Sequence, residues 1–168
     1  MYNSIKLIEQ LKEEKYNIKV HEHQPLFTVE DSKILRGKIN GAHSKNLFLK
    51  NKKNKFFLFS CVEDTSVNLK QISKSLKLGN VSFAKKDDLY KYLGVYPGSV
   101  TPFGLLNDKE CKVEFYFDQN FKSFSRVNFH PLVNTSTISL LLDDFLNFLI
   151  ANDKKVNIYN FINHSLDI

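Results

Sequence analysis

Hydrophobic positions along this chain recur in two different periods, which predict a mixture of helices and strands. Apolar residues at helical spacing predict helices that begin near residue 4 and cover about 29–36, 68–77, 87–93 and 141–151. Shorter apolar runs predict strands at about 18–22, 45–50, 55–61, 81–84, 111–118, 125–129 and 135–140. Because helices and strands are interleaved, with both hairpins and crossovers between strands, the pattern favours the α/β class with a mixed sheet.

Polar residues beside these runs predict where two helices begin. Ser4 is the expected N-cap of the first helix. The expected inward face of that helix consists of Ile5, Ile8 and Leu11. Thr28 stands three residues before Asp31, which is the spacing of a capping box, so the second helix is expected to begin at residue 29.

Turn residues and the chain's last segment complete the predicted organisation. Residues 51–54 are polar and separate two apolar runs, which predicts a hairpin whose second strand is buried on both faces. Residues 118–120 predict a turn between two further strands. After Asp153 the chain is mostly polar, and we expect this tail to pack loosely on the surface.

Length and composition point to one domain covering residues 1–168 in a cytoplasmic protein. The 168 residues suffice for a single core, and no apolar run approaches the length of a membrane span. Cys61 and Cys111 are too far apart for a redox or metal motif, so both are interpreted as reduced thiols. The net charge of +6 suits a polyanionic partner, but 22 of the 24 basic residues are lysine, which an AT-rich genome explains equally well.

A loop at residues 94–106 concentrates the chain's backbone-shaping residues, with three of the six glycines and two of the four prolines. Its apolar residues predict that the loop is anchored on a core. Unpaired backbone N–H groups on an anchored loop form a receptor for a carbonyl oxygen or an oxyanion. A tight connection between two elements explains the same composition, so the loop alone leaves both interpretations open.

Outside this loop, the two main candidates for a catalytic or binding role are Lys45 and His130. Lys45 is expected to precede a strand and to point into a cleft, although a solvated hairpin lysine fits the same position. His130 stands in an Asn-x-His-Pro segment rich in hydrogen-bonding groups, and a packed structural histidine is its alternative role. His21 and His23 share a spacing that suits one strand face, but no further ligands join them, so no metal site is predicted.

Four segments in the same order resemble the YbaK-like aminoacyl-tRNA editing family: residues 23–30, 41–49, 94–106 and 128–135. The resemblance covers about residues 20–150, and the wording Val-Thr-Pro-Phe-Gly-Leu in the third segment is most similar to the free-standing alanyl-tRNA(Pro) deacylase branch. It implies a central mixed, partly barrel-like β-sheet surrounded by helices. It also implies trans-editing hydrolysis of the ester in misacylated alanyl-tRNA(Pro).

The resemblance assigns roles to particular residues. Lys45 would anchor the tRNA 3′ end and orient the ester, and backbone amides of the loop, at Gly98 and Gly104, would polarise the carbonyl. His130 would position the aminoacyl group, with general base as its alternative role. The implied substrate-binding residues are Phe27, Thr28, Val29, Asn46, Thr101, Pro102, Phe103, Asn134 and Thr135. A ribose hydroxyl of the substrate would assist the reaction, which accounts for the lack of an obvious protein base or nucleophile, and no cofactor and no metal are implied.

The implied partner is the acceptor end of tRNA(Pro) carrying alanine, with transient contact to prolyl-tRNA synthetase or an elongation factor and no membrane. Lysines at 50, 52, 53 and 55, and at 70, 74 and 77, either follow acceptor-stem phosphates or form solvated faces. Two alternatives stay open: a deacylase for cysteinyl-tRNA(Pro) or another small misacylated tRNA, and a non-catalytic tRNA- or synthetase-binding module of the same fold.

Overall fold

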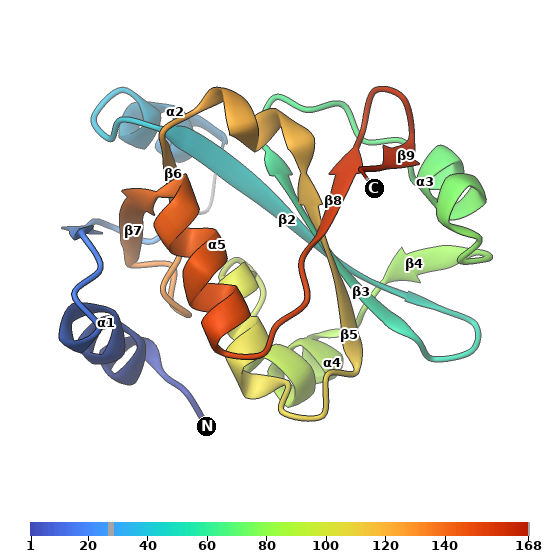
Figure 1. Cartoon of the computed structure of the whole chain (residues 1–168), viewed down its shortest axis with the longest axis horizontal. Helices are drawn as coiled ribbons and strands as arrows, with labels where there is room; N and C mark the ends of the chain where they lie inside the picture. The colour runs from blue at the N-terminus through green and yellow to red at the C-terminus, as the bar shows by residue number, and fades with distance from the viewer. Residues whose placement is uncertain (27–28, 168) are drawn as a thin grey trace.

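Among the described residues, nine strands form one sheet that organises the fold (Figure 1). The computed structural model describes residues 1–26 and 29–167, without the side chains of residues 29, 35 and 36. The strands are β1 (Ile18–Glu22), β2 (Ala42–Asn51), β3 (Phe56–Val62), β4 (Val81–Phe83), β5 (Val113–Asp118), β6 (Arg126–Phe129), β7 (Ser136–Leu141), β8 (Asn157–Asn160) and β9 (Ser165–Leu166).

The order across the sheet is β1-β7-β6-β2-β3-β5-β8-β9, and β4 pairs with β2 off this path. The pairs β2–β6, β3–β5 and β5–β8 are parallel, whereas β2–β3, β6–β7 and β1–β7 are antiparallel. The predicted mixed α/β architecture is therefore confirmed, and β2 lies at its centre, between the two halves of the sheet.

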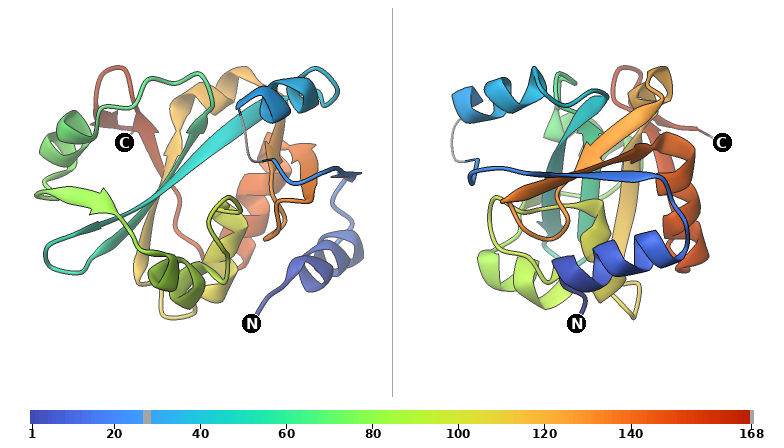
Figure 2. Two further views of the ribbon diagram at one scale, coloured as in Figure 1. Left: turned by 180° about the vertical axis from the view of Figure 1, so that it is seen from behind. Right: turned by 90° about the vertical axis from the view of Figure 1, so that its left-hand side faces the viewer.

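Helices surround this sheet on the outside (Figure 1, Figure 2). They are α1 (Ser4–Glu13), α2 (Val29–Arg36), α3 (Leu69–Leu76), α4 (Lys86–Asp88) and α5 (Leu142–Ala151), with a π-helical turn η1 (Leu89–Leu93) and the 3-10 helices η2 (Pro102–Asn107) and η3 (Gln119–Ser123). Among the described residues, no helix is both long and apolar enough to cross a membrane.

Strand β2 separates two hydrophobic cores, because its successive side chains point to opposite faces. Phe48 belongs to the larger core, where it joins Phe103 and α5. The neighbouring Leu49 belongs to the smaller core beside α3, with Phe59. Six of the seven residues of β3 are buried, which confirms that this strand is covered on both faces.

The start of α1 differs from the prediction by one residue. Asn3, not Ser4, is the N-cap, and its side-chain oxygen accepts a hydrogen bond from the backbone N–H of Lys6 at 3.0 Å. Ile5 is 68% exposed, whereas Leu7 and Leu11 are fully buried. Two leucines one turn apart define a different face from the one on which Ile5 lies, and the larger core selects that face.

In the second half of the chain one expected turn is present and one expectation is wrong. The turn expected at residues 118–120 is a 3-10 helix over residues 119–123, which carries the chain from β5 to β6 in a different part of the sheet. The segment after Asp153 is not a loose tail, because β8 pairs in parallel with β5 and buries Tyr159 completely and Phe161 to 3% exposure. The aromatic residues of this segment complete the smaller core beside α3.

Candidate active site

A cavity of about 90 Å³ opens where β2 and β6 run in parallel. Its volume corresponds to about three water molecules at roughly 30 Å³ each, so it suits a small group. Polar side chains from several elements surround it, and its lining residues are Leu26, Ser32, His43, Ser44, Asn46, Glu63, Asn128, Phe129, His130 and Thr137. Two of the predicted site residues, Asn46 and His130, thus share one small polar cavity.

His130 lies directly after β6, and its ring is fixed by a backbone contact. Nδ1 lies 2.9 Å from the carbonyl oxygen of Ser136, and because a carbonyl only accepts, Nδ1 carries the hydrogen. Burial lowers the pKa of His130, the hydrogen bond to Ser136 raises it in part, and His23 lowers it further. The neutral ring therefore keeps a lone pair on Nε2, which can accept a hydrogen bond or a proton.

His23 packs beside His130, with ring centroids 6.1 Å apart. Its Nε2 lies 2.9 Å from the Thr137 hydroxyl and its Nδ1 lies 2.8 Å from the carbonyl oxygen of Gln24. From the sequence, His23 on its own is considered only as a metal ligand. The structure instead connects His23 to two residues that line the cavity.

Asn46 presents its side chain on the cavity face of β2. Its Oδ1 accepts a hydrogen bond from the Ser60 hydroxyl, and its Nδ2 lies 3.3 Å from the Ser44 hydroxyl. The Ser44 hydroxyl donates in turn to the backbone carbonyl of Asn128 at 3.1 Å. These contacts tie β2, β3 and β6 together at the cavity and hold the Asn46 amide in a defined orientation.

Asn128 is a cavity residue whose importance the sequence did not reveal. Its Nδ2 donates to the carbonyl oxygens of Asn40 at 3.0 Å and Ala42 at 3.3 Å, which lie on either side of Gly41. Its Oδ1 is buried without a hydrogen-bond partner among the described residues. A buried amide held by two carbonyls fixes the geometry of this wall, and the unused acceptor is unusual in a folded protein.

Lys45 does not line the cavity. The residue lies inside β2, which begins at Ala42, so the expectation that it precedes the strand is wrong. Its cross-strand partner is Cys61, a residue of the smaller core, and its ammonium donates to the backbone carbonyl of Thr65. Thr65 is anchored by a 2.7 Å hydrogen bond from its hydroxyl to Asp118.

Lys45 nevertheless lies one residue from Ser44 and Asn46, at the end of the sheet where the cavity opens. Thr65 is its one hydrogen-bond partner among the described residues, so two of the three ammonium hydrogens remain for another acceptor. The Lys45 side chain thus lies on the opposite face of β2 from the side chains of Ser44 and Asn46, which line the cavity.

The glycine- and proline-rich loop is mostly part of the core. Residues 102–107 form a 3-10 helix capped by Thr101, and Pro102 occupies its first position, where its missing N–H costs nothing. The Gly104 amide donates to the Thr101 carbonyl at 3.0 Å, so this amide is already used within the helix. Gly104 also packs tightly on Leu93, since an added Cβ would lie 2.8 Å from the Leu93 Cβ. Close packing, not an open amide, is what this glycine provides.

Phe103 and Gly98 relate to the cavity in different ways. Phe103 is fully buried and makes an edge contact with Phe129 at 6.2 Å between ring centroids, so it supports a cavity wall from behind. Gly98 has a φ of +90° and faces Asn134, whose Nδ2 would lie 3.6 Å from an added Cβ. The loop therefore meets the segment after His130 through Gly98.

The remaining predicted residues lie around this arrangement. Thr135 accepts a hydrogen bond from the backbone N–H of His23 at 2.9 Å. Phe27 and Thr28, with the capping box expected at Thr28, lie outside the described residues, as does the side chain of Val29. No group of three or more His, Cys, Asp or Glu side chains within residues 1–26 and 29–167 is arranged to hold a metal ion.

Comparison with known proteins places this chain in the class of aminoacyl-tRNA editing domains. The family model described as "Aminoacyl-tRNA editing domain" matches residues 23–148, which include every strand around the cavity from β2 to β7. The chain belongs to this family. The resemblance noted in the sequence is therefore confirmed.

Individual relatives agree with this assignment. The chain is 35% identical over 147 residues to "Prolyl-tRNA editing protein ProX" of Acetoanaerobium sticklandii, covering 87% of this chain and 90% of the relative. It is 40% identical over 133 residues to "Prolyl-tRNA synthetase associated domain-containing protein 1" of Xenopus laevis, covering 76% and 79%. A crystal structure described as a candidate trans-editing enzyme for prolyl tRNA synthetase shares the fold, with a TM-score of 0.68 at 16% identity over 100% and 99% of the two chains.

Proposed function

We propose that this protein is an aminoacyl-tRNA deacylase that hydrolyses the ester of alanyl-tRNA(Pro) in trans, releasing alanine and free tRNA. The observation that carries the proposal is the 90 Å³ polar cavity walled by a neutral His130 and by Asn46. A cavity of this size suits a side chain as small as that of alanine. The named relative ProX, a prolyl-tRNA editing protein, supports tRNA(Pro) as the acceptor.

The chemistry asked of the protein is modest, because an aminoacyl ester is already activated. The neutral Nε2 of His130 would accept a hydrogen bond from the attacking water or from the substrate's ribose hydroxyl. The free hydrogens of the Lys45 ammonium would contact the terminal nucleotide and hold the ester over the cavity, with Asn46 beside it. Gly98, which faces Asn134 in the segment that follows His130, would be the loop residue that contacts the aminoacyl group. No metal or cofactor is needed for these steps.

The experiment measures hydrolysis of alanyl-, cysteinyl-, seryl- and prolyl-tRNA(Pro) and of alanyl-tRNA(Ala), with and without a chelator. We expect fast, chelator-insensitive loss of alanine from tRNA(Pro) only. Lys45→Ala and His130→Ala should each lower the rate by about 10²-fold or more, while Lys19→Ala, an exposed lysine on β1, should not. Faster hydrolysis of cysteinyl-tRNA(Pro) than of alanyl-tRNA(Pro) would favour the alternative of a cysteinyl-tRNA(Pro) deacylase. Binding of tRNA without hydrolysis of any ester would contradict the proposal and favour a binding module.

A further inference from the structure

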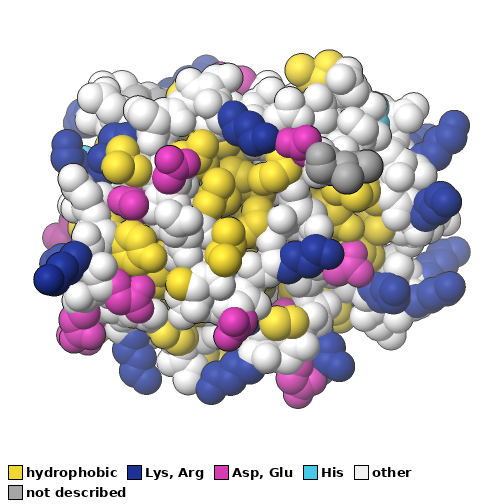
Figure 3. All heavy atoms as spheres, in the orientation of Figure 1, with side chains coloured by type: hydrophobic (Ala, Val, Ile, Leu, Met, Phe, Trp, Pro, Cys, Tyr) yellow, Lys and Arg dark blue, Asp and Glu magenta, His cyan; other side chains and the backbone are white. Residues whose placement is uncertain are grey.

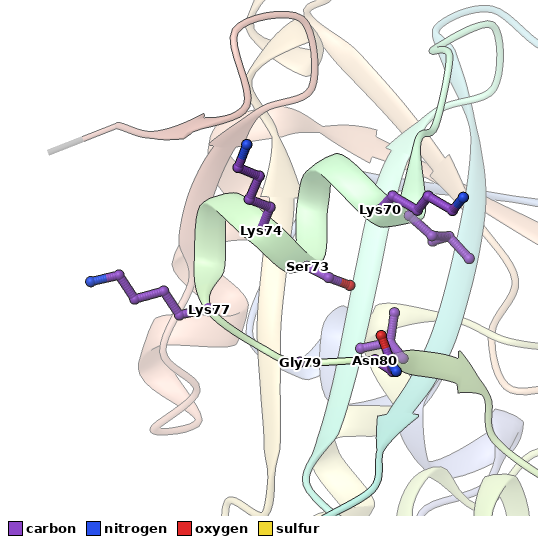
Figure 4. A pocket seen from close by; sticks show the side chains of 8 residues that line it. Lys70, Ser73, Lys74, Lys77, Gly79 and Asn80 are labelled. Carbon is purple, nitrogen blue, oxygen red and sulfur yellow. The ribbon is translucent and has the colours of Figure 1, made fainter.

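A groove of about 570 Å³ lies outside the candidate active site, between α3 and the start of β4 (Figure 4). Lys70 and Lys74 of α3 and Lys77, the C-cap of this helix, line the groove, and their side chains leave the helix in three different directions. Ser73 and Asn80 also line it. None of the described residues that line the groove is acidic. The charged side chains among the described lining residues are therefore all positive, beside the apolar Leu69 and Val81.

The groove continues into a second hollow of about 460 Å³ at the tip of the β2–β3 hairpin. Lys77, Gly79 and Asn80 line both hollows, and the second one adds Lys52, Lys53 and Lys55. The hairpin is fixed to the segment after α3 by a buried hydrogen bond from Asn51 Nδ2 to the Leu78 carbonyl at 2.9 Å. Among the described residues that line the second hollow, the one acid is Glu114 of β5, which accepts a hydrogen bond from the Tyr116 hydroxyl at 2.9 Å.

The six lysines of these two hollows, which we call the lysine track, are all exposed. Within the described part of the chain, none of them forms an ion pair with an acidic side chain, in contrast to Lys50, which pairs with Asp88. Figure 3 shows basic side chains gathered on this side of the molecule, over α3 and the hairpin. Unpaired charge concentrated on one side is the electrostatic footprint of a nucleic-acid partner.

The track also has the right position relative to the candidate active site. Strand β2 connects the two: Ser44 and Asn46 line the cavity at one end, and Asn51 lies at the hairpin at the other. Seven residues separate Ser44 from Asn51, which is about 23 Å at roughly 3.3 Å per residue. A ligand that enters the cavity with one end must therefore extend over roughly 20 Å to reach the track.

We propose that the lysine track binds the phosphodiester backbone of the tRNA acceptor stem while the aminoacyl end occupies the cavity. This inference rests on the proposed function for the identity of the RNA. The ammonium groups would contact phosphates, and Ser73 and Asn80 would donate hydrogen bonds to phosphate oxygens. Such contacts fix the position of an RNA helix without reading its sequence.

The test uses the full chain with Lys70, Lys74 and Lys77 all replaced by Gln. The matched control replaces Lys6, Lys12 and Lys109, which are exposed on the side of α1, so both variants carry the same net charge of about +3. Binding of an uncharged RNA hairpin with the tRNA(Pro) acceptor-stem sequence is measured by fluorescence anisotropy at several salt concentrations. Hydrolysis of 3′-O-alanyl adenosine, which has no stem, is measured in parallel.

We expect the α3 variant to bind the hairpin at least about tenfold more weakly, and the slope of log K against log[salt] to fall by about 2 to 3, since each lost phosphate contact removes roughly 0.7–0.9. The control should bind like the wild type, and all three proteins should hydrolyse the stemless ester equally. Equal binding by both variants would overturn the inference. If the α3 variant binds the hairpin more weakly than the control and the protein hydrolyses no ester, the proposed function is refuted, whereas the proposal that the lysine track binds RNA is supported.

Discussion

The turn at Gly41 allows a quantitative test of how the cavity wall is held. Gly41 has a φ of +104°, and an added Cβ would lie 2.8 Å from the carbonyl oxygen of Arg126 and 3.0 Å from its carbonyl carbon. These are backbone atoms of β6, so they cannot rotate away. Gly79 also has a positive φ, +74°, but an added Cβ there meets no atom within 4 Å. The two glycines therefore separate the cost of backbone strain from the cost of a collision.

Gly79→Ala is expected to lower the free energy of unfolding by about 1 kcal/mol, the cost of a left-handed conformation for a residue with a Cβ. Gly41→Ala carries at least that strain and in addition an overpacking cost of about 1–3 kcal/mol. We therefore expect a total loss of about 2–4 kcal/mol at Gly41. Urea unfolding followed by far-UV circular dichroism gives both values, since the difference in midpoint at equal slope reports the change in stability.

The Gly41→Ala substitution should also lower the rate of ester hydrolysis. The carbonyls of Asn40 and Ala42 flank Gly41 and accept both hydrogen bonds of the Asn128 amide, so a shifted turn releases this wall of the cavity. Below its unfolding transition, Gly41→Ala should hydrolyse 3′-O-alanyl adenosine more slowly than Gly79→Ala does. Equal losses of stability in the two variants would refute the assignment of a steric role to Gly41.

Three further predictions concern single side chains. The pKa of His130 is lower in the folded protein than in the unfolded chain, so the unfolded chain takes up this proton first as the pH falls below about 6.5, and the free energy of unfolding decreases until the folded pKa is passed. Hydrolysis needs the neutral ring, so its rate should fall as the pH is lowered, with a midpoint below 6.5 in a pH–rate profile. Burial raises the pKa of Cys61 to about 12, so a thiol reagent at pH 8 should label only the exposed Cys111 in the native protein and both cysteines in denaturant; two rapid labels without denaturant would contradict this. Tyr159→Phe removes a 2.7 Å hydrogen bond between the buried phenol and the Ser75 hydroxyl and should cost about 1 kcal/mol in a urea titration, whereas no measurable cost would mean that water replaces this contact freely.

Local patterns predicted the elements whose signals lie within one segment. The helix ending near Lys77 and the β2–β3 hairpin have matching periodicity, caps and turn residues in sequence, and the structure contains both. The helix near residues 87–93 also ends at Gly94 as its sequence indicates, with a φ of +66°. These elements are determined by residues at most a few turns apart, which is the range of a sequence pattern.

Partners distant in the chain determined what the sequence did not reveal. Ile158 and Tyr159 alone resemble a surface tail, and only pairing with the edge of β5, 41 residues earlier, makes them a strand. The cavity shows the same limit: His130 and Asn46 stood out in the sequence, but Ser44, Thr137 and Asn128 became site residues only when β2, β6 and β7 came together. The family resemblance assigned Gly104 an open backbone amide, and the close contact of this glycine with Leu93 was not visible in the sequence.

The pairing of β1 with β7 has a consequence for the kinetics of folding. Ile18 lies opposite Leu140, so 122 residues separate two partners of one ladder, and β2 pairs with β6 across more than eighty residues. Loop closure over such separations must precede any gain from the contacts, which makes folding slow for a chain of this size. The cavity is assembled by these same late pairings. A refolding chain should therefore regain its helical circular dichroism before it regains a site able to hold an aminoacyl ester.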